Sequence, residues 1–254
     1  MVRNDDILQR CELLLGAEAM QRLAAAHVII FGVGGVGSWC AESLVRTGVM
    51  HLTLVDFDTV SVSNINRQLM ATTATVGQVK TDVLRQRLME INPAAEIQTI
   101  HAVYTPETRD SFGLENYDVV IDAIDSLKDK ADLILTVTRL RHTMLVSSMG
   151  AALKLDPTRI HVDEFWHVQG DPLARALRQR FKREKQFPAR KFRCVYSDEL
   201  LMNKGVSTET LSTLPIHKTQ VNGTVAHVTA IFGFMLAGEV IKYLAQKPIR
   251  TVDE

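Results

Sequence analysis

The sequence predicts an α/β protein with a Rossmann-like, doubly wound and mostly parallel sheet, followed by a small C-terminal extension. Three observations carry this prediction. Short β-branched runs alternate with helical segments over the first 150 residues, an order typical of parallel sheets covered on both faces. The first run ends in a glycine-rich stretch at residues 32–37 that opens a helix. The alternation stops near Gly150, which separates residues 1–150 from a second region at 151–254.

The expected elements follow one another in this order. One or two short helices at residues 7–23, around Gly16, precede the first strand. Strands are expected at residues 27–31, 52–55, 97–100, 119–121, 143–147 and 160–165. Helices are expected at residues 38–47, 80–91, 128–141, 172–185 and 225–244. Residues 197–223 lack a clear period, so we expect a loop there.

Composition narrows the class of protein. The chain has 29 basic and 29 acidic residues, so its net charge does not indicate a partner of either charge, such as a nucleic acid. Cys11, Cys40 and Cys194 are too few and too scattered for a disulfide framework or a four-thiolate zinc site, which favours a reducing, cytoplasmic location. The charged N-terminus predicts no signal peptide. Residues 220–238 carry no charged side chain, but their apolar part spans only about 14 residues, which favours a buried helix over stable membrane insertion.

The glycine-rich stretch matches the G-x-G-x-x-G pattern through Gly32, Gly34 and Gly37, with Gly35 as a fourth glycine. Glycines let the backbone approach a phosphate, and the following helix N-terminus offers unpaired N–H groups and a positive dipole. Asp56 ends the next strand, 19 residues after Gly37, where a carboxylate accepts hydrogen bonds from ribose hydroxyls. Alone, these features favour a nicotinamide or flavin enzyme, with packing glycines as the simpler alternative.

A second set of polar residues changes this interpretation. It follows the loop in the order Asp58, Asn64, Arg67, Gln68, Lys80 and Asp125. A dehydrogenase has no evident need for this set, whereas a nucleotidyl-transfer site does. Arg67 and Lys80 can neutralise charge on the bridging and leaving oxygens of a triphosphate. Asp125, at the carboxyl end of a strand, is suited to Mg²⁺, and Asn64 can donate to phosphate without adding charge.

Each of these residues also has a simpler role. Lys80 can be a solvated lysine in the first turn of a helix, and Arg67 can be a surface ion-pair partner. Asp125 can cap the helix that begins near Ser126. Their joint occurrence, in this order after a dinucleotide-type loop, is what favours a nucleotide site.

The same segments resemble the MoeB/ThiF/HesA superfamily. The resemblance rests on residues 32–37, 56–58, 63–68, 77–80 and 122–125. It implies a homodimeric or heterodimeric Rossmann-like domain, here residues 1–150, that binds ATP and adenylates a carboxylate. It further implies that Asp56 holds the ribose and that Asp125 holds the magnesium. It also implies that the phosphates of ATP are held by Asn64, Arg67 and Lys80.

Two subfamilies compete for the acyl substrate. Activators of ubiquitin-like sulfur-carrier proteins usually carry paired Cys-x-x-Cys motifs for structural zinc, and this sequence has none. The stretches at residues 10–16, 119–126, 155–160, 171–174 and 194–199 instead look like the tRNA threonylcarbamoyladenosine dehydratases. Two departures are Cys11, where threonine is common, and residues 147–152, which are less glycine-rich than in some members.

The resemblance to the dehydratases implies several partners. It implies tRNA as the substrate, with residues 151–254 as the substrate-binding region. It also implies a homodimer in which an N-terminal arginine, for which Arg10 is the candidate, reaches the γ-phosphate of the partner subunit's ATP. A cysteine-desulfurase system is a further partner that the family suggests.

The second half of the chain carries its own charge pattern. Nine basic residues lie between positions 175 and 193, opposed only by Glu184. Such a cluster concentrates positive potential, as binding of a phosphate backbone requires. The expected nucleic-acid contacts are Arg175, Arg178, Lys182, Arg183, Lys185, Arg190, Lys191 and Arg193. Phe181, Phe187 and Phe192 interleave with them and can stack on bases; the alternative is a solvated basic helix whose phenylalanines lie in the core.

The hypothesised reaction follows from the resemblance. The threonyl carboxylate of the modified adenosine attacks the α-phosphate of ATP, and pyrophosphate leaves with help from Mg²⁺, Arg67 and Lys80. The neighbouring carbamoyl group then attacks the acyl-adenylate, which closes a ring and releases AMP. The residues expected to take part are Arg10, Arg67, Lys80, Asp125 and Cys194.

Cys194 has two interpretations, because the ring closure is intramolecular and can proceed without a protein nucleophile. By family analogy Cys194 forms a thioester or accepts sulfur as a persulfide, and the nearby Arg193 and Lys191 would favour its thiolate. The alternative is a small apolar residue on a strand. His167 and His217 are candidate general bases, although no spacing favours either over a surface histidine.

Three other functions stay open at this point. An adenylyltransferase for a sulfur-carrier protein would use the same ATP site and release pyrophosphate with that protein rather than with tRNA. A nucleotide-binding adaptor would bind ATP without turning it over. A nicotinamide dehydrogenase would bind a nicotinamide cofactor.

Overall fold

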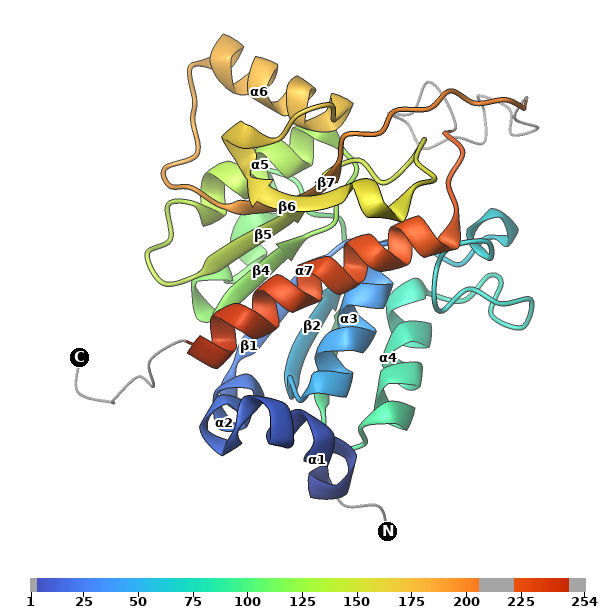
Figure 1. The fold of residues 1–254 in the computed structure, drawn as a ribbon, viewed down its shortest axis with the longest axis vertical. Helices are drawn as coiled ribbons and strands as arrows, with labels where there is room; N and C mark the ends of the chain where they lie inside the picture. Colours follow the sequence, from blue (N-terminus) through green and yellow to red (C-terminus); the bar gives the residue numbers. More distant parts are fainter. Residues whose placement is uncertain (1–3, 206–221, 247–254) are drawn as a thin grey trace.

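The computed structural model describes residues 4–205 and 222–246, which form one seven-stranded sheet flanked by helices on both faces (Figure 1). The strands are β1 (His27–Phe31), β2 (His51–Val55), β3 (Glu96–Ile100), β4 (Val119–Asp122), β5 (Met144–Ser148), β6 (Ile160–Glu164) and β7 (Arg193–Ser197). Their spatial order is β3-β2-β1-β4-β5-β7-β6. All pairs are parallel except β6 with β7, which forms an antiparallel edge. This confirms the expected Rossmann-like, mostly parallel sheet.

Helices cover the two faces of the sheet. They are α1 (Asn4–Leu15), α2 (Ala17–Ala25), α3 (Gly37–Thr47), α4 (Lys80–Ile91), α5 (Leu127–Val137), α6 (Pro172–Glu184) and α7 (Ala226–Gln246). α3, α4 and α7 pack on one face, around a core that includes Leu44, Leu84 and Phe232. α5 and α6 pack on the other face, around Ile134 and Leu177. The residues after Gly150 thus extend the same sheet and cover both of its faces.

Local sequence explains where several elements begin and end. β1 is buried along four of its five residues, because a central parallel strand is covered on both faces. α3 ends at Gly48, whose φ of 107° lies in the left-handed region that glycine adopts without steric penalty. α6 begins with Pro172, and the Asp171 carboxylate caps it by accepting the N–H of Ala174 at 2.8 Å.

The strand register places one residue from each of five neighbouring strands in a single row. Phe31 of β1 is level with Asp122 of β4, and Asp122 is level with Ser147 of β5. Ser147 is level with Cys194 of β7, which is level with Asp163 of β6. Level residues on neighbouring strands point to the same face, here the face that α5 and α6 cover. This cross-sheet row connects the centre of the sheet with its outer edge.

Two segments differ from the expectation. The helix expected at residues 128–141 ends as α5 at Val137. Thr138 accounts for this end, because its hydroxyl donates to the carbonyl of Ile134 at 2.8 Å and accepts the N–H of Ala189 at 3.1 Å. The expected strands do not include β7, which begins at Arg193, the last residue of the basic run at 175–193, and has no alternating pattern. Much of the loop expected at residues 197–223 lies outside the described residues.

α7 lies across one face of the sheet (Figure 1). Among the described helices it alone is long and apolar enough to cross a membrane, judged by length and composition. Val228, Phe232 and Leu236 are fully buried against α3 and the sheet, whereas Phe234 is 45% exposed. The helix expected to be buried therefore has one buried and one exposed face.

Candidate functional site

The carboxyl ends of β1, β2 and β4 meet at one edge of the sheet, and the loops that follow these strands carry most of the expected site residues. The glycine loop, residues 32–37, follows β1; Asp56 follows β2; and Asp125 comes shortly after β4. In an open α/β sheet this edge is where ligands bind. The topology therefore brings these three features together.

Close backbone packing accounts for two of the four loop glycines. Gly32 has a φ of +86°, and a Cβ there would lie 2.7 Å from the carbonyl oxygen of Ala123. A Cβ on Gly37 would lie 1.9 Å from the carbonyl oxygen of Gly32. Gly34 and Gly35 have more room, with side-chain atoms of other residues 3.5 Å and 3.2 Å from the Cβ position. Packing thus requires Gly32 and Gly37, while Gly34 and Gly35 leave the backbone at those two positions uncovered by a side chain.

Asp56 holds the glycine loop in place. Its Oδ2 accepts the N–H of Val33 at 2.8 Å, and its Oδ1 accepts the N–H of Asp58 at 2.9 Å. Burial raises the pKa of the Asp56 carboxyl above its ordinary value, while the positive charge of Lys80 and the two N–H groups oppose that rise. A carboxylate offers about four acceptor positions, so Asp56 can also accept a ribose hydroxyl.

Lys80 is the first residue of α4, and only 4% of it is exposed. Its ammonium donates to Asp58 Oδ2 at 2.7 Å, and its backbone N–H donates to the carbonyl of Asp58 at 3.1 Å. The alternative of a solvated lysine is therefore wrong. The pair fixes a positive charge close to Asp56, beside the loop that follows β2.

The segment after β2 carries Asn64, Arg67 and Gln68. Asn64 is 8% exposed, and its Oδ1 accepts the N–H of Ser61 at 3.1 Å, so its amide NH₂ group is the part that can serve a ligand. A guanidinium nitrogen of Arg67 donates to the carbonyl of Ser63 at 2.8 Å. The amide of Gln68 lies against the glycine loop. Its Oε1 is buried and accepts no hydrogen bond from the residues that the structure describes.

The turn after β4 rests on a buried ion pair that sequence reasoning missed. Lys130 of α5 donates to Asp122 Oδ2 at 2.6 Å, and both side chains are 0% exposed. The Ser147 hydroxyl donates to the same oxygen at 2.6 Å. Asp122 Oδ1 accepts the N–H of Ile124 at 3.1 Å. These contacts fix the turn that carries Asp125, an exposed residue.

Arg10 does not lie with the other expected site residues of its own chain. It is an exposed residue of α1, and α1 packs at the C-terminal end of α3, where the Cys11 thiol lies 3.7 Å from the carbonyl oxygen of Arg46. The glycine loop lies at the opposite end of α3, and 11 helical residues span about 16 Å. Any contact of Arg10 with a nucleotide therefore has to be made in another subunit.

Cys194 corrects the expectation of a reactive thiolate. It is 0% exposed on β7, between β5 and β6, and burial raises the pKa of its thiol well above the ordinary value. Arg193 does not offset this effect, because successive strand residues point to opposite faces and its guanidinium pairs with Glu239 of α7. Lys191 is exposed. These facts favour the alternative, a small apolar residue on a strand.

Neither candidate general base has a described position beside the glycine loop. His217 lies outside the described residues. His167 lies at the outer edge of the sheet, where its Nδ1 is 3.4 Å from Asp163 Oδ1. Asp163 belongs to β6, which is separated from β4 by β5 and β7.

The basic run contains two kinds of residue. Arg178 donates to the carbonyl of Phe165 at 3.1 Å and lies over its ring. Arg190 donates to three carbonyl oxygens at and after the end of α5. Both guanidinium groups are engaged by the fold, which argues against their expected role as nucleic-acid contacts. The exposed members of the expected set are Arg175, Lys182, Arg183, Lys185, Lys191 and Arg193, of which Arg193 is also paired with Glu239.

The phenylalanines of this run also divide. Phe181 is 0% exposed and Phe192 is 5% exposed. Both pack against Phe165, with ring centroids 5.9 Å and 5.0 Å away. Their expected role in base stacking is wrong, because the core beneath α6 takes up both rings. Phe187 is 53% exposed, and its ring lies 6.2 Å from that of Trp166.

Among the described residues, no group of three or more His, Cys, Asp or Glu side chains could hold a metal ion. Mg²⁺ that arrives with a nucleotide needs only one or two carboxylates, because phosphates and water supply its other oxygens. The exposed carboxylate of Asp125 fits that need.

Comparisons with known proteins relate the chain to one family. A family model described as the ThiF family matches residues 8–253. A tRNA threonylcarbamoyladenosine dehydratase of Haemophilus influenzae is 34% identical over 97% of this chain and 97% of its own length. The Escherichia coli protein of that name is 36% identical, over 93% and 92%. The crystal structure of E. coli TcdA in complex with ATP matches with a TM-score of 0.83 and 34% identity, covering 96% of both chains.

Proposed function

Because this chain belongs to the ThiF family, and within it to the tRNA threonylcarbamoyladenosine dehydratases, we propose that it is an ATP-dependent dehydratase acting on tRNA. It adenylates the carboxylate of threonylcarbamoyladenosine and closes that group into a ring. The observation that carries this proposal is the convergence of the glycine loop, Asp56, Lys80 and Asp125 at one sheet edge. The chain also matches an ATP-bound dehydratase over 96% of its length.

We assign ATP to the edge formed by the ends of β1, β2 and β4. The N–H groups of the glycine loop and the N-terminus of α3 suit the phosphates, and Asp56 suits the ribose. Lys80 and Arg67 supply positive charge beside them. The buried Gln68 Oε1 supports a ligand here, because a buried acceptor without a partner costs free energy and a nucleotide donor can satisfy it.

Asp125 is the residue that would hold Mg²⁺, together with phosphate oxygens of ATP. When bound, the ion neutralises charge on the phosphates. The chain's own contribution is to aim the carboxylate: Asp122 ties the turn to Lys130 and Ser147, so Asp125 stands on a fixed backbone.

In the reaction, the threonyl carboxylate attacks the α-phosphorus of ATP, and the bond from that phosphorus to the bridging oxygen of pyrophosphate breaks. Lys80, with Asp58 holding its ammonium, and Arg67 stabilise the charge that develops on the leaving oxygens. The carbamoyl group of the same nucleoside then attacks the activated carboxyl carbon, and AMP leaves. An intramolecular attack has a high effective concentration, so this step requires no thiolate from the buried Cys194.

The remaining partners are proposals of the same kind. We assign RNA backbone contacts to the exposed basic residues of the run, with Arg175, Lys182 and Lys185 among them. A homodimer would let Arg10 reach the partner's ATP, and the exposure of Leu13 and Leu14, at 83% and 84%, supports an interface on α1. Three free cysteines support a reducing cytoplasm, whereas the burial of Cys194 gives a desulfurase partner no sulfur acceptor there.

ATP–pyrophosphate exchange tests the proposal. The protein is assayed with threonylcarbamoyl-modified tRNA, with unmodified tRNA and with a sulfur-carrier protein. We expect exchange and ring-closed product with the modified tRNA alone. Asp125→Ala should abolish both. Glu115→Ala is the matched control, because Glu115 is an exposed residue just before β4. It therefore lies at the amino ends of the strands, opposite the carboxyl ends where ATP is assigned.

The other outcomes select other functions. Exchange with the carrier protein alone would make the chain a sulfur-carrier adenylyltransferase that uses the same ATP site. ATP binding without exchange under any of the three conditions would favour a nucleotide-binding adaptor. Equal loss in Asp125→Ala and Glu115→Ala would remove the assigned role of Asp125.

A further inference from the structure

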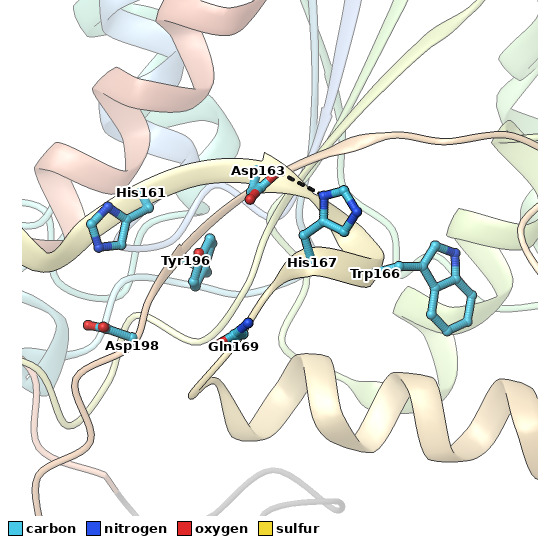
Figure 2. Close-up of a pocket in the computed structure, with 7 residues that line it drawn as sticks. All are labelled: His161, Asp163, Trp166, His167, Gln169, Tyr196 and Asp198. Carbon is cyan, nitrogen blue, oxygen red and sulfur yellow. Dashed lines mark hydrogen bonds and ion pairs between the residues drawn. The ribbon is translucent and has the colours of Figure 1, made fainter.

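A cavity of about 480 Å³ opens at the outer edge of the sheet, away from the glycine loop. Figure 2 shows the side chains around it, which come from β6, from β7 and the residue that follows it, and from the turn and loop that connect β6 to α6. Its lining consists of His161, Asp163, Trp166, His167, Gln169, Tyr196 and Asp198. We call it the edge cavity. None of these residues has a role in the adenylation described above.

Two carboxylates give the edge cavity its charge. The N–H of Glu164, 2.6 Å from Asp163 Oδ1, lowers the pKa of the Asp163 carboxyl, and His167 adds to this effect. The guanidinium of Arg159, 2.8 Å from Asp198 Oδ1, lowers the pKa of Asp198. Both groups are therefore ionised acceptors at neutral pH, and each side chain remains 43% exposed.

Aromatic rings form the other walls. Tyr196 is 8% exposed, and its ring centroid lies 5.7 Å from that of His161. Trp166 is 38% exposed, and its indole is supported by Phe165 at 5.2 Å and by Phe187 at 6.2 Å. Flat aromatic side chains beside hydrogen-bonding groups are how proteins hold unstacked RNA bases.

The cross-sheet row relates this cavity to the adenylation site. Asp122 ends β4 at the turn that carries Asp125, and Asp163 is the last residue of the row. Three strand spacings separate the two residues, or about 14 Å at roughly 4.8 Å for each spacing. A nucleotide close in sequence to one that reacts beside Asp125 can therefore reach the edge cavity.

We propose that the edge cavity binds an unpaired RNA base that carries an exocyclic amino group, from a nucleotide near the reacting nucleoside. The inference rests on the proposed function and adds a base-recognition site to it. The Asp163 carboxylate accepts a hydrogen bond from the amino group, and Trp166 stacks on the base. The Gln169 amide forms a hydrogen bond with another polar group of the same base. Adenine, cytosine and guanine offer an amino donor, whereas uracil offers none.

The lining disfavours other ligands. Ionised Asp163 and Asp198 only accept hydrogen bonds, so they cannot bind the oxygens of an anion such as phosphate. A metal ion finds no set of three His, Cys, Asp or Glu ligands in residues 4–205 and 222–246. A flat, uncharged donor beside an aromatic ring is what these side chains can satisfy.

The first test uses Asp163→Asn, which keeps the shape of the side chain and removes its charge. Glu115→Gln is the matched control, because it changes the same charge at the amino end of β4. The probe is a synthetic anticodon stem-loop that carries threonylcarbamoyladenosine, with binding measured by fluorescence anisotropy and ATP affinity measured separately. We expect about tenfold weaker RNA binding for Asp163→Asn, because the amide oxygen of asparagine still accepts a hydrogen bond but lacks the charge that strengthens it. ATP affinity should not change, and the control should match the wild type.

A second test identifies the base. Each unpaired base of the stem-loop is changed in turn to a partner without the amino group: adenine or guanine to hypoxanthine, and cytosine to uracil. At one position this change should weaken binding to the wild type at least tenfold and weaken binding to Asp163→Asn clearly less, which is the non-additivity that a double-mutant cycle shows for a direct contact. Trp166→Leu provides an independent variant, and it should weaken RNA binding through lost stacking.

Four outcomes decide the matter. Weaker RNA binding by Asp163→Asn, with coupling at one base, supports the edge cavity. Should a folded Asp163→Asn and Trp166→Leu bind the stem-loop as tightly as Glu115→Gln, while the wild type turns the RNA over, the edge cavity alone is rejected. Additive effects at every base also reject it. A wild type that neither binds nor turns over the stem-loop rejects the proposed function itself.

Discussion

Lys130→Met tests the buried ion pair beneath the adenylation site. Lys130 is 0% exposed, and its ammonium lies 2.6 Å from Asp122 Oδ2 and 3.4 Å from the Ser147 hydroxyl. Methionine retains an unbranched apolar stem and removes the charge. Lys128→Met is the matched control, because Lys128 belongs to the same helix but its side chain is 57% exposed.

The magnitude follows from what remains around Asp122. In Lys130→Met the carboxylate keeps the Ser147 hydroxyl at 2.6 Å and the Ile124 N–H at 3.1 Å, but no positive partner. Removing one partner of a buried ion pair costs about 3–5 kcal/mol. That is a large share of the roughly 5–15 kcal/mol that stabilises a typical domain. Lys128→Met should change the free energy of unfolding far less, because water already screens its contact with Glu107.

Urea unfolding followed by circular dichroism measures these changes, and calorimetric titration with ATP measures the site. ATP affinity in the presence of Mg²⁺ should also fall in Lys130→Met, because Asp122 fixes the turn that carries Asp125. The double variant with Asp122→Asn should be less destabilised than the sum of the two single variants. Equal unfolding free energies for Lys130→Met and Lys128→Met, or strict additivity with Asp122→Asn, would refute the reasoning.

Three further predictions concern other parts of the fold. Gly238→Ala should stabilise the protein by about 0.5–1 kcal/mol in thermal unfolding, because a Cβ there meets no atom within 4 Å and alanine favours a helix interior. Gly233→Ala in the same helix should destabilise it, since its Cβ would lie 2.5 Å from the carbonyl oxygen just before α3. Burial would raise the pKa of Glu42, but Arg87 and a second arginine hold it below its ordinary value of 4.5. The ionised Glu42 therefore stabilises the fold above that pH. The free energy of unfolding of Glu42→Gln, measured in urea, should be lower than that of the wild type, and this difference should shrink as the pH falls through the lowered pKa. Cys194→Ala should retain pyrophosphate exchange and ring closure in the assay with modified tRNA, and loss of ring closure alone would restore a chemical role for the thiol.

The sheet can be predicted from sequence because its signals are local. A parallel strand covered on both faces has to be apolar, as β1 is. The helices between the strands have apolar residues that repeat every three or four positions. Glycines and Asp56 directly follow two such strands, while Lys80 opens a helix. Topology then brings them to one edge, so the location of the candidate site follows from element order alone.

The contacts beneath that edge depend on tertiary structure. Asp122 and Lys130 belong to different elements, and a lysine on a helix usually reaches solvent. The nearest sequence signal is that Lys130 lies four residues before Ile134, on the apolar face of α5. A lysine at such a position needs a buried partner, but the sequence does not say which carboxylate supplies it.

The basic run shows the same limit for charge patterns. Arg178 and Lys182 look equivalent in the sequence, yet only the guanidinium of Arg178 meets the carbonyl of Phe165. Arg190 reaches carbonyls at and after the end of α5 because the chain passes the C-terminal end of that helix. Composition correctly indicates a cluster of positive charge, but it does not separate residues that support the fold from those that face solvent.

The cross-sheet row explains why Cys194 is better neutral than charged. It lies between Ser147 and Asp163 in the row, and its thiol feels the charges of Lys130 and Asp122. A thiolate there would add a second negative charge close to Asp122 in a fully buried site, where a single ammonium, that of Lys130, pairs with a single carboxylate. A neutral thiol leaves that pair intact and packs like a small apolar side chain. The row therefore connects the proposed adenylation site with the edge cavity, and the neutral thiol within it agrees with the proposal that the carbamoyl group of the substrate is the nucleophile.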